Sequence, residues 1–127
     1  MTPIVFINCK SVPFVDQIIS GEKIWETRNR NTLGRLVGKR VFLAETGNGK
    51  PVVRCVAEFC KPIVIDNPGV WDGIRETTCV PVGSRYDWQP DTKAKMIYFV
   101  QKVQKVRRFI PPEGKRHGRI WMEYEEE

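Results

Sequence analysis

The stretch SGEKIWETRNR, residues 20–30, places Lys23, Glu26 and Arg28 close together in the chain. A glutamate carboxylate accepts hydrogen bonds from amino and amide N–H groups, while a lysine and an arginine hold phosphate or carbonyl oxygens. Around one hollow, these side chains would bind a polar, planar ligand. An ion pair on a solvated strand is the commoner explanation of a glutamate beside an arginine. The choice between the two depends on the elements that carry these residues.

Two elements must position this group. Residues 11–20, SVPFVDQIIS, predict a short amphipathic helix. Gly21 is expected to end it, because glycine adopts the left-handed conformation without a penalty from Cβ. Residues 23–30 then predict a strand, in which Glu26 and Arg28 share a face because alternate side chains of a strand point the same way.

Most of the remaining chain predicts strands, because its apolar runs are rich in β-branched and aromatic residues. Residues 66–95 are the least regular part, with a possible short helix over NPGVWDGIRETT. We expect an α+β fold, a small barrel-like sheet of five to six mostly antiparallel strands with one or two short helices. Such a barrel can leave a cleft between its helix and its mouth. The expected strands cover residues 3–10, 23–30, 39–46, 51–65 and 94–112, the last of these ended by its two prolines, with a final strand after the loop that begins at residue 113.

Length and composition fit one globular domain, 1–127. No apolar run approaches the roughly 20 residues that span a bilayer, and the N-terminus does not resemble a signal peptide, so we expect a cytoplasmic protein with no membrane partner. The four cysteines include no C-x-x-C pair and the chain has one histidine. Neither a metal site nor another cofactor is therefore predicted.

The net charge of +6 is unevenly distributed. Basic residues concentrate in residues 23–54 and 93–119, and acidic ones in the middle and in the tail EYEEE. If the two basic blocks share a face, that face attracts polyanions, whereas independently solvated lysines would have no such role. We expect the tail, 123–127, to be disordered. An alternative is that it docks on a basic partner, as an adaptor would, or folds over the protein's own basic face.

The residues Gly21, Lys23, Glu26 and Arg28 match G-x-K-x-x-E-x-R, which resembles the hallmark of the ASCH domain family. Residues 96–121 are similar to the C-terminal outline of ASCH and related PUA-like domains: an aromatic strand, prolines, a basic glycine-containing loop and a closing aromatic strand. The resemblance covers the chain except its irregular middle. It implies a PUA-like β-barrel with the motif on the floor of a cleft, and an RNA-binding module. Some members of the family are enzymes.

The first hypothesis is that the domain binds RNA or a nucleotide-like ligand in this cleft. Tyr86 and Trp88 lie in a predicted loop and could stack bases, whereas Trp25 and Trp121 fit core positions. Glu26 would read the edge of a base. The candidate ligand-binding residues are Gly21, Lys23, Glu26, Arg28, Tyr86 and Trp88, together with Arg30, Lys115, Arg116 and Arg119 as phosphate contacts at the rim.

The second hypothesis is an amidohydrolase acting on an acylated cytidine-type nucleoside, with Lys23 and Glu26 as catalytic residues. The resemblance implies it, because one ASCH group hydrolyses the acetyl amide of acetylated cytidine with a lysine that corresponds to Lys23. In that group a threonine stands in place of Glu26, and a later glutamate assists. Here Thr27 is adjacent but on the opposite strand face, and Glu76 is a candidate later carboxylate. A water activated between Lys23 and Glu26 is the alternative to a threonine nucleophile.

A ribonuclease is a third possibility, since one ASCH member is described as one. General acid-base catalysis there commonly uses histidine, and His117 lies in the basic loop GKRHGR. A solvated loop histidine explains the same residue. The sequence leaves open the identity of the ligand, the presence of catalysis and the oligomeric state.

Overall fold

The centre of the molecule is a parallel pair of strands, β1 (Ile4–Asn8) and β3 (Arg40–Thr46). The computed structural model describes residues 1–126. Both strands consist mainly of β-branched, aliphatic and aromatic residues, and their side chains are buried on both faces. Such continuous apolar runs are typical of strands that are covered on both sides.

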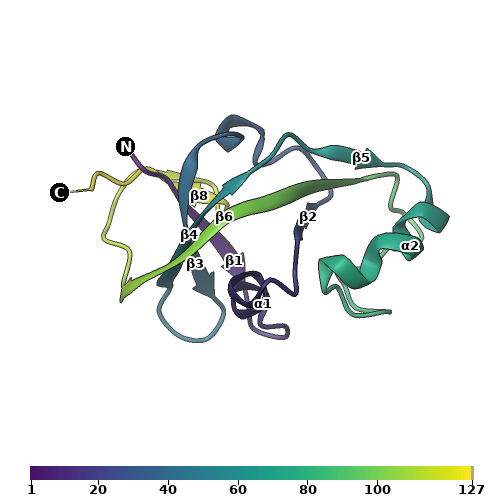
Figure 1. Cartoon of the computed structure of the whole chain (residues 1–127), viewed down its shortest axis with the longest axis horizontal. Helices are drawn as coiled ribbons and strands as arrows, with labels where there is room; N and C mark the ends of the chain where they lie inside the picture. The colour runs from purple at the N-terminus through teal and green to yellow at the C-terminus, as the bar shows by residue number, and fades with distance from the viewer. Residues whose placement is uncertain (127) are drawn as a thin grey trace.

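The strands form one open sheet in the order β2-β6-β4-β3-β1-β8-β7, with β5 paired to β6 outside this path (Figure 1). The prediction of an α+β fold with one or two short helices is confirmed, since the structure has two, but five to six strands was too few. The sheet is also not a closed barrel, because β2 and β7 stand at opposite ends of the path. The elements not yet given are β2 (Trp25–Arg28), β4 (Val52–Phe59), β5 (Ile63–Ile65), β6 (Lys95–Phe109), β7 (Arg116–His117), β8 (Trp121–Met122), α1 (Phe14–Ser20), α2 (Pro68–Thr78) and the 3-10 turn η1 (Gly34–Leu36).

The additional strands arise where the sequence suggested longer elements or loops. The run over 51–65 divides into β4 and β5, with the break at residues 60–62 where Pro62 cannot donate a ladder hydrogen bond. The basic loop after β6 contains the two-residue strand β7, which pairs with β8.

Strand β6 connects the two parts of the sheet. Its first residues pair with β2 on one side and β5 on the other, and the rest of it pairs with β4. The register against β4 shifts twice, and Lys102 has a positive φ of 54°. Bulges of this kind bend and twist a strand. The bend allows one 15-residue strand to serve both parts of the sheet.

Both helices have clear ends. Gly21 ends α1 with φ 84°, as the sequence predicted, and its N–H donates to the carbonyl of Ile18. The side chain of Asn67 caps α2 by accepting hydrogen bonds from the N–H groups of Gly69 and Val70. Helix α2 therefore orders part of the middle segment that had looked irregular.

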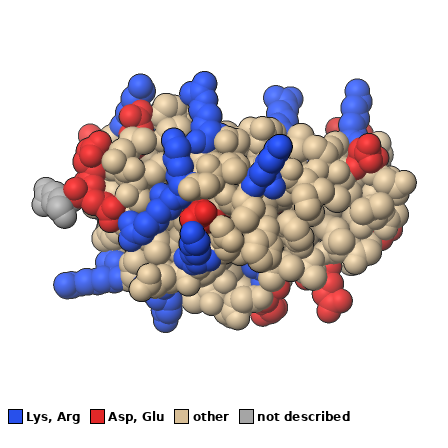
Figure 2. Space-filling model, turned by 45° about the horizontal axis from the view of Figure 1, so that its top comes forward, with Lys and Arg blue, Asp and Glu red and all other residues tan. Residues whose placement is uncertain are grey.

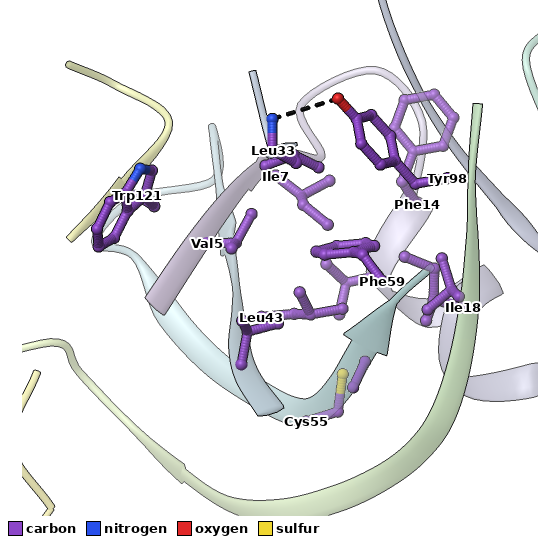
Figure 3. Close-up of a cluster of buried hydrophobic side chains, with 14 of the residues drawn as sticks. Val5, Ile7, Phe14, Ile18, Leu33, Leu43, Cys55, Phe59, Tyr98 and Trp121 are labelled. Atoms are coloured by element: carbon purple, nitrogen blue, oxygen red, sulfur yellow. Dashed lines mark hydrogen bonds between the residues drawn. The ribbon is translucent and has the colours of Figure 1, made fainter. Parts of the chain in front are cut away.

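The main hydrophobic core lies between α1 and the sheet (Figure 3). Tyr98 is fully buried in it, and its hydroxyl donates to Oδ1 of Asn31 and accepts from the N–H of Leu33. Trp121 is 9% exposed and belongs to this core, and Trp25 packs against a separate cluster around Trp71, so both agree with their expected core positions.

The two chain ends meet on the face of the sheet opposite α1. The N–H of Thr2 donates to the carbonyl of Tyr124, whose ring stacks on Phe109, and Glu126 pairs with Arg40. Glu127 lies outside the described residues, and disorder of the tail in solution stays a prediction. Among residues 1–126, no helix is both long and apolar enough to cross a membrane.

Candidate functional site

A cavity of about 360 Å³ opens where β1 and β3 end. The two strands are parallel and in register, so Asn8 and Thr46 lie side by side at its edge. The start of α1, strand β2, the loop before β6 and the turn between β7 and β8 complete the wall. Its other lining residues are Phe6, Ile7, Phe14, Lys23, Glu26, Thr27, Arg28, Asn29, Arg85, Tyr86, Lys95 and Arg119.

Lys23 reaches the cavity because Gly21 reverses the chain between α1 and β2. The N–H of Lys23 donates to the carbonyl of Gln17, which fixes the turn. Its ammonium donates to the carbonyl of Thr78 at 2.6 Å and lies 4.6 Å from the centroid of the Phe14 ring. The residue is 2% exposed. Burial lowers its pKa, and the nearby carboxylate of Glu26 partly offsets this effect.

Glu26 is held between two cations. Strand β2 pairs with β6 so that Glu26 stands opposite the buried Tyr98. Its Oε1 lies 3.7 Å from Nζ of Lys23, and its Oε2 accepts a hydrogen bond from Arg28 at 3.2 Å. The residue is 5% exposed. Burial of a carboxylate is costly unless the group is ion-paired and hydrogen-bonded, and Glu26 has both kinds of partner here.

A second buried lysine, Lys95, lies on another wall. Its ammonium donates to Oδ1 of Asn29 at 3.0 Å and to the carbonyl of Tyr86 at 2.7 Å, and it lies 5.2 Å from the Trp71 ring. The residue is 3% exposed. Burial lowers its pKa, and the charge of Asp87 acts in the opposite direction.

Asp87 anchors the loop that brings Tyr86 to the cavity. Burial alone would raise the pKa of this carboxyl. Hydrogen bonds from the backbone N–H of Gly83 and Trp88 and from the side chains of Trp71 and Arg75 instead hold it far below its usual range. The anchored loop places the Tyr86 ring edge-on to Phe14, with centroids 5.3 Å apart. The position of this part of the cavity wall therefore depends on α2, which carries Trp71 and Arg75.

The sequence matches no family model and no curated protein. Solved structures share the fold, among them the crystal structure of ASCH from Zymomonas mobilis and those of two single-residue variants of that protein. Each aligns with a TM-score of 0.68 at 18% or 19% identity, over 86% of this chain and 73% to 75% of the other. The chain has the ASCH fold. The recognition of this fold from the sequence is thereby confirmed.

In this ASCH fold, half of the proposed ligand-binding residues line the cavity. They are Lys23, Glu26, Arg28, Tyr86 and Arg119. The motif G-x-K-x-x-E-x-R therefore places its lysine, glutamate and arginine in one hollow, while its glycine ends the helix that precedes them.

The other proposed residues lie elsewhere. Gly21 ends α1, and Arg30 is exposed beyond the end of β2. Trp88 packs against the cluster around Trp71. Lys115 forms an ion pair with Glu123, and the guanidinium of Arg116 lies over the Phe6 ring. Neither Lys115 nor Arg116 lines the cavity.

His117 and Glu76, which were considered for catalysis, are also outside the set of lining residues. The His117 ring stacks on Trp121, with centroids 3.9 Å apart, and its Nε2 lies 2.8 Å from a carboxylate oxygen of Glu123. Thr27 does line the cavity, although strand alternation had suggested the opposite face.

Sequence reasoning missed Lys95 and Arg85 as cavity residues. One signal for Lys95 was available, because strand alternation places it on the same face as Ile97, which is buried. Arg85 had no such signal, since the loop before β6 is positioned by Asp87 and α2. Within residues 1–126, no three His, Cys, Asp or Glu side chains gather as metal ligands would.

Proposed function

We propose that this ASCH domain binds RNA or a nucleotide, with one nucleotide held in the cavity. The observation that carries the proposal is the buried carboxylate of Glu26, which lies between Lys23 and Arg28 and lines the same hollow as they do. A carboxylate fixed in this way accepts hydrogen bonds from a base amino or imino group. The surrounding cations favour a ligand that carries phosphate.

The size of the cavity fits this ligand. About 360 Å³ lies near the lower end of the range for small-molecule pockets, roughly 300 to 1,000 Å³. The volume suits one nucleotide rather than several, so the rest of an RNA chain would continue outside the mouth. Sequence-specific RNA recognition commonly uses a base that has left the stack in this way.

An arginine over an aromatic ring provides a surface for the base. The guanidinium of Arg85 lies 4.8 Å from the centroid of the Tyr86 ring, and one of its N–H groups donates to the tyrosine hydroxyl. A base can replace the guanidinium on the Tyr86 ring, which leaves the N–H groups of Arg85 free to bind phosphate. Trp88, which the sequence had also offered for stacking, packs against the cluster around Trp71 and has no part in this proposal.

Titration with labelled single-stranded RNA and with nucleoside monophosphates, at several salt concentrations, tests the proposal. Removing one charge-assisted hydrogen bond commonly costs enough free energy for about a tenfold loss of affinity, and we expect this loss for Arg28→Ala and for Glu26→Gln. Lys39→Ala is the matched control, because this exposed lysine precedes β3, whose other end reaches the cavity. Absence of binding at low salt, or equal losses in all three variants, would contradict the proposal.

One observation favours an amidohydrolase as the second candidate. The ammonium of Lys23, whose pKa is lowered by burial, lies 3.7 Å from Glu26 at the edge of a cavity. A water hydrogen-bonded to Glu26 would attack the acetyl carbonyl carbon of an acetylated cytidine and give its proton to the carboxylate. That proton would pass to the leaving amine, giving acetate and cytidine. Thr27 lines the same cavity and is the alternative nucleophile.

Incubation with acetylated cytidine distinguishes this second candidate from binding alone. Release of acetate that disappears in Lys23→Met and in Glu26→Gln, and persists in Lys39→Ala, would establish the amidohydrolase. Unchanged substrate at high protein concentration would exclude this reaction for that compound.

A further inference from the structure

The charges around the cavity do not balance. Among the described residues, its lining includes the cations Lys23, Arg28, Arg85, Lys95 and Arg119, and only one carboxylate, that of Glu26. Figure 2 shows Lys and Arg spread along one face of the molecule, with acidic side chains near the C-terminal end and at several other places between and below them. The excess of positive charge at the cavity is therefore local and does not reflect one continuous basic patch.

The carboxylate of Glu26 is already engaged. It contacts both Lys23 and Arg28, so these three side chains form one group. Among the described residues, neither Lys95, Arg85 nor Arg119 forms an ion pair with a carboxylate. Three cations of the cavity thus have no counter-ion in contact within residues 1–126.

Lys95 is the most informative of these three. It is 3% exposed, yet both of its hydrogen-bond acceptors are neutral: Oδ1 of Asn29 and the carbonyl of Tyr86. Its ammonium has three N–H donors, so one is left without a protein acceptor among the described residues. Asp87, whose charge reaches Lys95, is occupied by Arg75 and Trp71. A buried cation without a charged partner is unfavourable unless a ligand supplies the opposite charge.

We propose that Lys95 and Arg85 bind a terminal phosphate of the ligand, so that the cavity takes the phosphorylated end of an RNA or a free nucleotide. The inference rests on the proposed function and makes it more specific. Both cations adjoin Tyr86: Lys95 holds its carbonyl, and Arg85 contacts its ring and hydroxyl. Arg119, on the turn between β7 and β8, adds positive charge to the wall.

A terminal phosphate fits these groups better than an internal linkage. A phosphate monoester carries close to two negative charges at neutral pH, as in phosphorylated side chains, whereas an internal diester carries one. An arginine fork and an ammonium together can satisfy several of its oxygens. The cavity also has room for about one nucleotide, which suits a chain end.

Calorimetric titration with four ribonucleosides, their 5′ and 3′ monophosphates, and dinucleoside monophosphates tests this inference. For the wild type we expect at least one monophosphate to bind about tenfold or more tightly than its nucleoside and than the matching dinucleoside. Lys95→Met, which keeps the length of the side chain, should remove most of this preference. Lys93→Met is the matched control, because Lys93 is exposed and stands two positions earlier.

A second variant, Arg85→Gln, covers the case in which Lys95→Met fails to fold, because Arg85 is exposed. It should also reduce the preference for the monophosphate. Equal affinity for nucleosides and monophosphates would overturn the inference while leaving nucleotide binding intact. Equal affinity for monophosphates and dinucleosides would overturn the terminal position of the phosphate. If no probe and no RNA binds, the proposed function itself fails.

Discussion

The ammonium of Lys23 lies 3.7 Å from the carboxylate of Glu26, although both side chains are almost completely buried. Neither residue is part of a solvated strand edge. Arg28 completes the group from the next position on the same face of β2. Because a charge inside a protein needs a partner, each of these side chains depends on the others for its place beside the cavity.

Glu26→Gln should therefore destabilise the fold. Loss of the carboxylate leaves Lys23 buried with no anion in contact, which commonly costs about 3 kcal/mol of unfolding free energy. The loss of unfolding free energy relative to the wild type should be smaller at about pH 9 than at about pH 6. A lysine with a lowered folded pKa binds fewer protons in the folded state than in the unfolded one, so stability rises with pH.

Denaturant unfolding of the wild type, Glu26→Gln, Lys23→Met and the double variant measures this coupling. We expect the double variant to be more stable than the sum of the two single losses predicts. Strict additivity of the two losses would show that the pair does not act as a unit.

Gly21→Ala separates a structural from a binding role of the motif glycine. An added Cβ would meet no atom within 4 Å, but φ is 84°, so a loss of about 1 kcal/mol from backbone strain is expected. Gly73→Ala, in the middle of α2 with equally open surroundings, should instead stabilise by about 0.5 to 1 kcal/mol. Nucleotide affinity measured for both folded variants should equal that of the wild type. A selective loss in Gly21→Ala would indicate contact with the ligand.

Asp87→Asn tests the anchor of the Tyr86 loop. The folded pKa of Asp87 is depressed, so its contribution to stability is present above the unfolded pKa of about 3.9 and is lost as the pH falls through the lower folded pKa. At neutral pH we expect a loss of about 2 kcal/mol, because four donors lose a charged acceptor. Unfolding measured from neutral to acidic pH should show a shallower decline for the variant. Parallel declines would contradict the assignment.

Deletion of residues 125–127 tests whether the acidic tail masks the ligand site. Glu126 pairs with Arg40 beside a second, open groove, which shares no lining residue with the cavity. We expect unchanged nucleotide affinity at about 0.15 M salt, where exposed charges more than about 8 Å apart are largely screened. Stability should fall by less than about 1 kcal/mol, as for an exposed ion pair. Tighter nucleotide binding after the deletion would show that the tail competes for the site.

The sequence by itself determined the local elements and the composition of the motif. The glycine that ends α1 could be predicted because few residues accept its backbone conformation. The apolar runs of β1 and β3 could be predicted because buried strands need them. The pattern G-x-K-x-x-E-x-R could be recognised because its residues are close in the chain. For the same reason, Lys23, Glu26 and Arg28 could be proposed as neighbours.

Only the tertiary structure decided which distant groups join them. Lys95 becomes a buried cation of the cavity through Asn29 and the Tyr86 carbonyl, which come from other segments of the chain. The sheet is open because its end strands, β2 and β7, do not pair with each other, and no local sequence pattern determines that pairing. Local propensity fixes dihedral angles, whereas burial and electrostatic pairing depend on contacts between residues far apart in sequence, which form only when the chain packs.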